Sequence, residues 1–209
     1  FAVAVVGIAC GGGESKVVDQ YFNALKAKDN QTLTSFAAVI FDKPVEKWKI
    51  TRAGEEQRAA VTAPELAAKV KDLEVQISQN TKDARATLDA AKVEEVKALR
   101  RAGKPLPASL QAVAADFDKF NHSDVELKKQ LSTAKDVLEK ERRHMTLSVG
   151  NVDNLESVSG EVVSKQVELD LTLKDQQPAP YVMTLRKYEL QREGPRSISR
   201  WVVQEIKPR

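Results

Sequence analysis

The sequence predicts an α+β protein with two N-terminal helices and a curved antiparallel sheet of about five strands, into which a long antiparallel α-helical hairpin (a coiled coil) is inserted. Three observations predict this class. Apolar residues recur at helical spacing near the N-terminus, a helical pattern continues across residues 64–145, and apolar and polar residues alternate after Met145. Aromatic residues make up only 5 % of the chain, while Ala, Lys and Glu are frequent, a composition that favours long helices.

Two amphipathic helices are expected in ESKVVDQYFNALKAKDNQTLTSFAAV (14–39). Ser15 is a suitable N-cap for the first helix. Asp29-Asn30 interrupts the apolar pattern and can cap the second helix. The apolar stripe of the first helix consists of Val17, Val18, Tyr21, Phe22 and Leu25.

Residues 64–145 carry the helical pattern in two arms. The first arm starts at Pro64, because proline is favoured in the first turn of a helix. The stretch AGKPLPAS (102–109) holds one Gly and two Pro and separates the arms. We therefore expect two helices of roughly 40 residues each, about 55–60 Å long, paired as a hairpin.

The second arm has apolar residues in a heptad-like register with two polar interruptions, Asp124 and Glu141. Ser123 and Glu126 have the spacing of a capping box. This spacing predicts a kink or a restart of the helix within FNHSDVE (120–126).

One strand is expected before the hairpin and four after it. Trp48 and Ile50 alternate with polar residues, which predicts a strand over residues 45–52. The four later strands form an antiparallel meander with one buried face. Their alternating apolar residues are Leu147 and Val149, then Val167, Leu169, Leu171 and Leu173, then Tyr181, Met183 and Leu185, and finally Trp201 and Val203.

Composition and missing motifs exclude several classes of protein. The formal net charge is only +3, and no cluster of Lys and Arg with interleaved aromatic residues occurs, so we expect no nucleic-acid partner. A single cysteine excludes an intramolecular disulfide and a multi-cysteine zinc site. No phosphate-binding, dinucleotide-binding, zinc-protease or serine-hydrolase motif is present. We therefore predict no catalytic residue, no metal site and no cofactor.

The N-terminal stretch FAVAVVGIACGGG allows three interpretations. A transmembrane helix needs about 20 apolar residues, and only about half that number is present. A buried strand is the second interpretation, since Val and Ile favour strands. The third is the end of a secretory signal peptide, an apolar segment followed by small residues at a cleavage site.

Val6-Gly7-Ile8-Ala9-Cys10 resembles the lipobox of bacterial lipoproteins. The resemblance implies cleavage before Cys10 and attachment of a diacylglycerol to its sulfur. Residues 1–9 are then the remnant of a signal peptide, and residues 10–14 a lipidated tether that holds the protein to a membrane. The implied location is the bacterial cell envelope, at the periplasmic face of the outer membrane if the cell is Gram-negative. A free buried cysteine is the alternative.

VVDQYFNALKAKDNQTLTSFAAV and the closing RWVVQEI resemble the first helices and the last strand of the nuclear-transport-factor-like (cystatin-like) α+β cone. The resemblance covers residues 15–53 and 145–209. We expect residues 15–63 and 145–209 to form the cone domain, with the hairpin insertion at residues 64–144. Such cones enclose a pocket. Its candidate lining residues are Tyr21, Phe22, Trp48, Tyr181 and Trp201, for which core packing is the alternative.

Acid–base chemistry on such a cone would use a buried Asp or His beside a Tyr or a second acid. Spacing singles out no such pair. Asp42 and His144 are conceivable bases, but we expect Asp42 in a solvated turn and His144 at a basic helix end. The remaining conceivable groups are Asp170 as a base and Tyr21, Tyr181 and Tyr188 as donors.

Three functions follow from these observations. The first is a non-catalytic binding or scaffold module, tethered to the membrane through Cys10, whose hairpin at residues 64–144 contacts a partner protein. The second is a periplasmic adaptor-like accessory of a transport complex, and the third is a cone-fold isomerase or hydrolase. The sequence specifies no small-molecule ligand.

Overall fold

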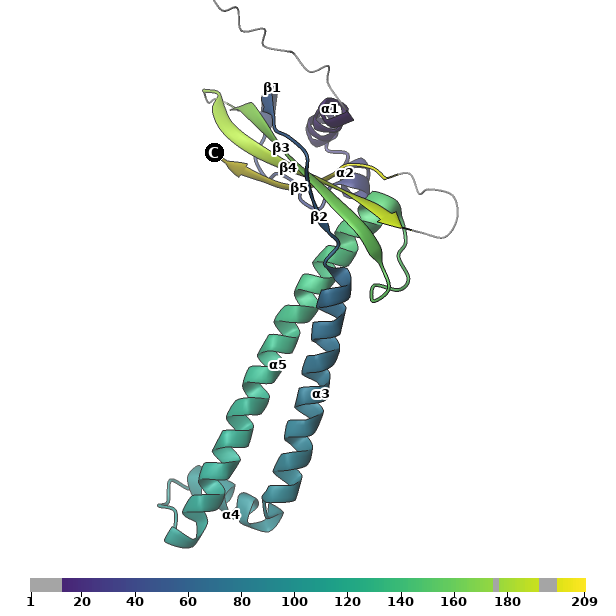
Figure 1. The fold of residues 1–209 in the computed structure, drawn as a ribbon. Coiled ribbons are helices and arrows are strands. Elements are labelled where there is room, and N and C mark those ends of the chain that lie inside the picture. The colour runs from purple at the N-terminus through teal and green to yellow at the C-terminus, as the bar shows by residue number, and fades with distance from the viewer. Residues whose placement is uncertain (1–12, 175–176, 192–198) are drawn as a thin grey trace, which may run out of the picture. The chain divides into compact units, whose positions relative to one another are not determined.

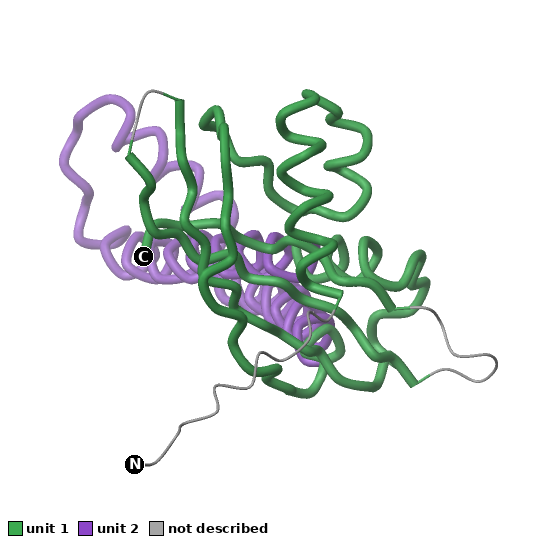
Figure 2. The backbone as a smooth tube through the Cα atoms, turned by 90° about the horizontal axis from the view of Figure 1, so that it is seen from above, with its two compact units in different colours: residues 1–64, 140–209 green, residues 65–139 purple. Residues whose placement is uncertain are grey.

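The computed structural model describes residues 13–174, 177–191 and 199–209. In these residues the chain has an α+β fold with five helices and an open, curved antiparallel sheet of five strands, as the sequence predicts (Figure 1). The chain divides into two compact units (Figure 2). We call residues 1–64 with 140–209 the sheet unit and residues 65–139 the helical unit.

The two N-terminal helices are α1 (Gly13–Ala27) and α2 (Asn30–Phe36). Lys28 has a positive φ of 55°, in the left-handed region that commonly follows the last turn of a helix. Asp29 then caps α2, because its side chain accepts a hydrogen bond of 3.0 Å from the backbone N–H of Thr32. The interruption predicted at Asp29-Asn30 is therefore a cap.

The five strands are β1 (Val45–Ala53), β2 (Gln57–Ala60), β3 (Ser159–Leu173), β4 (Ala179–Gln191) and β5 (Val202–Pro208). Their order in the sheet is β1-β3-β4-β5, all antiparallel, and β2 pairs with β3 at residues that β1 does not reach. Near the start of β3, Gly160 pairs with Leu190 at a φ of +135°. A Cβ atom there would lie 2.3 Å from the Glu189 carbonyl oxygen, so the pairing requires glycine.

One predicted strand is wrong and one observed strand was not predicted. Leu147 and Val149 alternate in sequence, yet they belong to the last turns of helix α5 (Ala108–Val149). Met145 and Val149 are buried four residues apart, a helical spacing that overrides the short alternation. Strand β2 gave no signal, because all of its side chains are exposed and therefore show no alternation.

Alternation along β3 sends side chains to both faces of the sheet. Leu169 and Leu171 point to the face covered by α1 and α2, in the first core. Val162 lies on the opposite face, where it packs with Met145 of α5. The second core consists of Val61, Ala63, Met145, Val149, Val152, Val162 and Tyr188. The N-terminal half of β3 thus contributes Val162 to the second core, and the C-terminal half contributes to the first core.

The helical unit contains parts of α3 (Ala63–Thr87) and α5 and the whole of α4 (Ala90–Arg101). The predicted first arm is not one helix. It breaks after Leu88, where Asp89 caps α4 by accepting hydrogen bonds of 3.0 Å from Ala91 N–H and 3.3 Å from Lys92 N–H. The stop predicted at 102–109 lies between α4 and α5.

Helix α5 is continuous over residues 120–126, so the predicted restart at Ser123 is wrong. Side-chain pairs four residues apart support the helix there. Lys128 Nζ lies 2.8 Å from Asp124 Oδ2, and Gln130 donates a hydrogen bond of 3.2 Å to Glu126. Ser123 and Glu126, which have the spacing of a capping box, thus lie in the middle of a helix.

Helices α3 and α5 lie side by side in the helical unit (Figure 1). Lys135 Nζ is 2.7 Å from Glu74 Oε1, and Asn80 donates a hydrogen bond of 3.2 Å to the Phe120 carbonyl oxygen. Among the described residues, no helix combines the length and the apolarity needed to cross a bilayer.

Candidate functional site

The predicted lipidation site lies outside the described residues. Cys10, the signal remnant 1–9 and residues 10–12 of the predicted tether all precede Gly13, where the description begins. Within the described residues, Gly13 and Glu14 are already part of α1. Lipidation of Cys10 therefore stays a prediction from the sequence.

Three of the five candidate pocket residues form one aromatic cluster in the first core. The rings of Tyr21 and Phe22 meet edge to face at 5.2 Å between centroids, and Trp48 stacks on Phe22 at 5.3 Å. The Tyr21 hydroxyl donates to the Val39 carbonyl at 3.1 Å and accepts from the Phe41 N–H at 2.8 Å. These bonds fix the loop after α2 against α1.

The chemistry of this cluster is that of a packed core. Burial raises the pKa of Tyr21 to about 12, with the Phe41 N–H acting weakly in the other direction. Tyr21 and Phe22 are completely buried, whereas Trp48 is half-buried and donates a hydrogen bond of 2.8 Å to Asp19. Their side chains therefore stabilise α1 on the sheet.

The other two candidates pack near this cluster without joining its ring contacts. Tyr181 meets Phe41 edge to face at 5.4 Å, and Lys187 Nζ lies 4.8 Å from the centre of the Trp201 ring. A surface cleft of about 640 Å³ lies beside Phe41 and is lined by Asp42, but by none of the five candidates. Its lining residues are Leu25, Lys26, Lys28, Phe41, Asp42, Lys43, Pro44, Val45 and Glu46.

A buried polar cluster, which the sequence did not predict as a unit, joins the C-terminal end of α5 to the sheet. Arg186 on β4 donates hydrogen bonds of 2.9 and 3.4 Å to the carboxylate of Glu141 on α5. Only 7 % of the Glu141 side chain and 17 % of the Arg186 side chain are exposed. Thr62 donates a longer bond of 3.4 Å to the same carboxylate, and Arg186 lies over the ring of Tyr188 at 5.1 Å.

Two buried polar atoms at this cluster have no hydrogen-bond partner among the described residues: His144 Nδ1 and the Tyr188 hydroxyl. Burial, followed by the positive charge of Arg186, lowers the pKa of His144, while Glu141 opposes that shift. Burial, followed by the negative charge of Glu141, raises the pKa of Tyr188. Both side chains are therefore held in their neutral forms at pH 7.

Ser148 completes the junction between α5, β4 and the segment before β5. Its hydroxyl accepts a hydrogen bond of 3.0 Å from the Tyr188 N–H and donates one of 2.9 Å to the Arg200 carbonyl. The Arg200 guanidinium in turn donates to the Leu147 carbonyl at 2.6 Å. Because a carbonyl in the last turn of α5 thus has a hydrogen-bond partner, these contacts indicate a structural junction. In the sequence, the polar interruption at Glu141 was the one sign of this junction.

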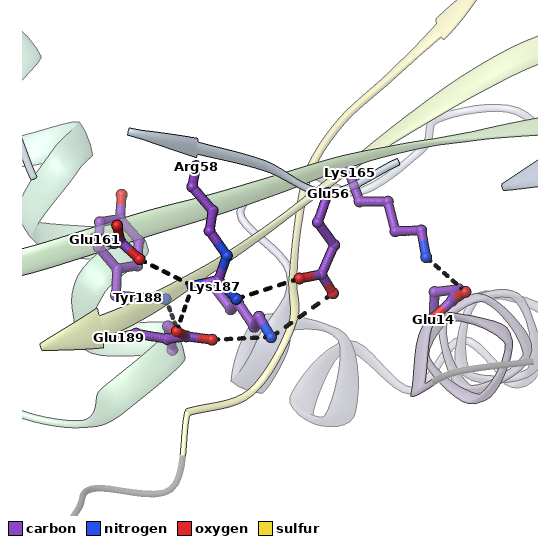
Figure 3. Close-up of polar contacts among 9 residues, drawn as sticks. Glu14, Glu56, Arg58, Glu161, Lys165, Lys187, Tyr188 and Glu189 are labelled. Carbon is purple, nitrogen blue, oxygen red and sulfur yellow. Dashed lines mark hydrogen bonds and ion pairs between the residues drawn. The ribbon is translucent and has the colours of Figure 1, made fainter. Parts of the chain in front are cut away.

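Charged residues on β2, β3 and β4 form a network of ion pairs (Figure 3). Arg58 Nη1 lies 2.9 Å from Glu161 Oε2 and 2.8 Å from Glu189 Oε2. Glu189 also pairs with Lys187 at 3.1 Å. Glu56 also contacts both cations, at 3.5 Å from Arg58 and 3.9 Å from Lys187, so three carboxylates pair with two cations and the network carries a formal charge of −1. A single excess charge among paired groups is a weak basis for selecting a charged partner.

Glu14 and Lys165 form a separate pair that ties the first turn of α1 to β3 (Figure 3). Their side-chain atoms lie 2.8 Å apart, and both side chains are nearly buried. Burial by itself raises the pKa of Glu14, but the hydrogen bond from Lys165, a backbone hydrogen bond and the charge of Lys165 together bring the pKa below its ordinary value. Glu14 is thus charged at neutral pH.

The helical unit carries an open groove of about 320 Å³ between α3 and α5. We call the apolar residues where α3 and α5 face each other the apolar seam. Two helices alone cover such a seam incompletely. Most seam residues here are half-buried, while Leu73 is 4 % exposed. Val137, at the groove, is 43 % exposed. The groove is lined by Leu66, Lys69, Glu126, Lys129, Gln130, Thr133, Ala134 and Val137.

A second, larger cleft of about 560 Å³ lies where α4 meets α3 and α5. Arg100 on α4 holds Asp118 on α5 through two hydrogen bonds of 2.6 and 2.7 Å, and Val96 packs on Leu110 and Ala114. The cleft is lined by Asn80, Thr81, Ala84, Arg85, Leu88, Ala90, Val93, Glu94, Lys97, Phe117, Phe120, Asn121, Asp124 and Lys128.

The described residues contain no group of three or more His, Cys, Asp and Glu side chains that could hold a metal ion. Comparison with known proteins found no match among family models, curated proteins or solved structures.

Proposed function

We propose that the chain is a membrane-tethered lipoprotein that acts as a non-catalytic binding or scaffold module in the cell envelope. Its anchor is Cys10, and residues 64–144 contact a partner protein. The anchor rests on the lipobox-like sequence before Cys10, and the contact rests on the surface of the helical unit.

The groove between α3 and α5 is the observation that carries the proposal. Its lining combines the apolar side chains of Leu66, Ala134 and Val137 with the charged side chains of Lys69, Glu126 and Lys129. An apolar groove flanked by charged side chains can accept the apolar face of an amphipathic helix from another protein. Covering the half-buried seam would contribute roughly 25 cal/mol for each Å² of apolar area removed from water.

Two exposed valines on α5 allow a matched test of this contact. Val137 lies at the groove and is 43 % exposed, whereas Val125 is 59 % exposed and does not line it. In cells that make the protein, the wild-type chain solubilised in mild detergent should migrate on a native gel above the size of the 23.1 kDa chain. Val137→Lys should reduce that complex, and Val125→Lys should leave it intact.

The proposal requires that a substitution in the groove reduces the amount of the complex. If both lysine variants preserve the complex equally, the groove is not the contact. If the wild-type chain runs at the size of a monomer in every detergent tested, the scaffold function is wrong.

The anchor has its own test. The Cys10→Ala variant should move from the membrane fraction to the soluble fraction, because the sulfur that would carry the lipid is missing. Equal membrane fractionation of the variant and the wild-type chain contradicts lipidation and leaves the partner contact to be judged separately.

A further inference from the structure

The cleft between α3, α4 and α5 differs from the groove in shape and in lining. Helices bound it on three sides, and its volume of about 560 Å³ lies within the range of small-molecule sites, roughly 300–1,000 Å³. Its apolar lining residues come from the three helices and from the link between α3 and α4, and they are Ala84, Leu88, Val93, Phe117 and Phe120. Sites between helices of a bundle commonly bind apolar ligands.

The two phenylalanines of the cleft are accessible, unlike the buried aromatic residues of the first core. Phe117 and Phe120 are both half-buried and one helical turn apart on α5, so their rings form one wall. Lys97 Nζ lies 5.3 Å from the centre of the Phe117 ring. An apolar chain along this wall would be shielded from water by the rings and by the stem of Lys97.

The charges at the cleft leave one cation without a partner. Lys97 is paired with Glu94 at 2.8 Å, and Lys128 is paired with Asp124 at 2.8 Å. Arg85, on α3, has no hydrogen bond or ion pair among the described residues. The cleft therefore presents one guanidinium whose charge nothing in the helical unit neutralises.

We propose that this cleft binds a single-chain carboxylate amphiphile, with the carboxylate on Arg85 and the hydrocarbon chain along Phe117 and Phe120. Arginine presents two parallel N–H donors that match a carboxylate, which favours this head group over an alcohol or an amine. The hydrocarbon chain of the ligand supplies the apolar area that becomes buried against Phe117 and Phe120. This inference is independent of the protein contact at the groove.

The test uses the purified 209-residue chain and isothermal titration calorimetry with three probes: dodecanoate, dodecan-1-ol and dodecyltrimethylammonium. The chain should bind one dodecanoate, about tenfold more tightly than dodecan-1-ol, since a charge-assisted bidentate pair contributes on the order of a tenfold gain in affinity. Binding of dodecyltrimethylammonium should be the weakest of the three, because Arg85 repels it.

Variants locate the site and the head group. Arg85→Gln should lower the affinity for dodecanoate about tenfold and leave that for dodecan-1-ol unchanged. Arg142→Gln is the control, an exposed arginine on α5 that lines neither hollow of the helical unit, and should bind like the wild type. Ala84→Trp should fill the cleft and abolish binding of all three probes, with far-UV circular dichroism verifying the fold.

Three results overturn the proposal. One is the absence of dodecanoate binding to the wild-type chain. The second is dodecanoate binding that Arg85→Gln leaves unchanged. The third is binding that persists in a folded Ala84→Trp variant, which would place the ligand outside the cleft.

Discussion

Removing one partner of the buried pair between Glu141 and Arg186 should destabilise the sheet unit strongly. Arg186→Met leaves the Glu141 carboxylate, whose side chain is 7 % exposed, without its charged partner. Glu141→Leu leaves the Arg186 guanidinium, 17 % exposed, over the ring of Tyr188. Breaking a buried ion pair from one side costs about 3–5 kcal/mol, because a charge stays buried without compensation.

The two single variants should differ in a definite order. Arg186→Met should cost about 4 kcal/mol, because the carboxylate that remains is the more deeply buried group. Glu141→Leu should cost about 3 kcal/mol, because the guanidinium retains some water and its contact with Tyr188. The double variant should lie within about 1 kcal/mol of the wild type, since two apolar side chains need no compensation.

Urea denaturation followed by tryptophan fluorescence measures these changes in the sheet unit alone. Both tryptophans of the chain, Trp48 and Trp201, lie in that unit. Glu205→Leu is the control, because Glu205 and Lys207 form a pair of 3.1 Å that is half exposed. Removing an exposed pair should change the free energy of unfolding by less than about 1 kcal/mol.

Two results refute this reasoning. Single variants as mild as Glu205→Leu would mean that water reaches the pair. A double variant as unstable as the sum of the singles would mean that the two side chains do not interact, whatever their distance.

Three further predictions concern other positions. Because the pKa of His144 is lowered from the ordinary 6.5, the unfolded chain binds a proton at this residue before the folded chain does. The free energy of unfolding should therefore fall as the pH decreases below about 6.5. His144→Gln should flatten this dependence, measured by denaturation at a series of pH values. Gly160→Ala should cost about 3 kcal/mol or more in the same assay, because its φ is +135° and the new Cβ would meet the Glu189 carbonyl. Asp89→Ala should cost about 1 kcal/mol, seen as faster amide hydrogen exchange in the first turn of α4, with no change in tryptophan fluorescence.

The sequence predicts the parts of the fold in which one side of an element is buried along its length. Leu169, Leu171 and their neighbours in β3 alternate because α1 and α2 cover one face. The same reasoning failed for Leu147 and Val149, where two apolar residues fit both periods. In the structure these residues are helical, and Ser148 between them accepts a hydrogen bond from the Tyr188 N–H. That contact joins residues 40 positions apart, so the local pattern could not indicate it.

The candidate sites were harder to predict, because they join residues that are distant in sequence. Glu141 interrupts an apolar pattern, but its partner Arg186 lies 45 residues away on another element. The cleft at Arg85 is lined by α4 as well as by α3 and α5, and the capping residue Asp89 is the local signal that a new helix begins at Ala90. The prediction of a partner contact within residues 64–144 depends on a helical segment too long to serve the core of one domain, and it stays a prediction.

Photo-crosslinking in the cells that make the protein tests the scaffold function most directly. A photoreactive phenylalanine analogue would replace Val137 in one variant and Val125 in the other, two exposed positions on the same helix. We predict one adduct of defined mass from position 137, joined to a single protein of the cell envelope, and little or none from position 125. Equal labelling of many proteins from both positions would contradict a specific contact at the groove.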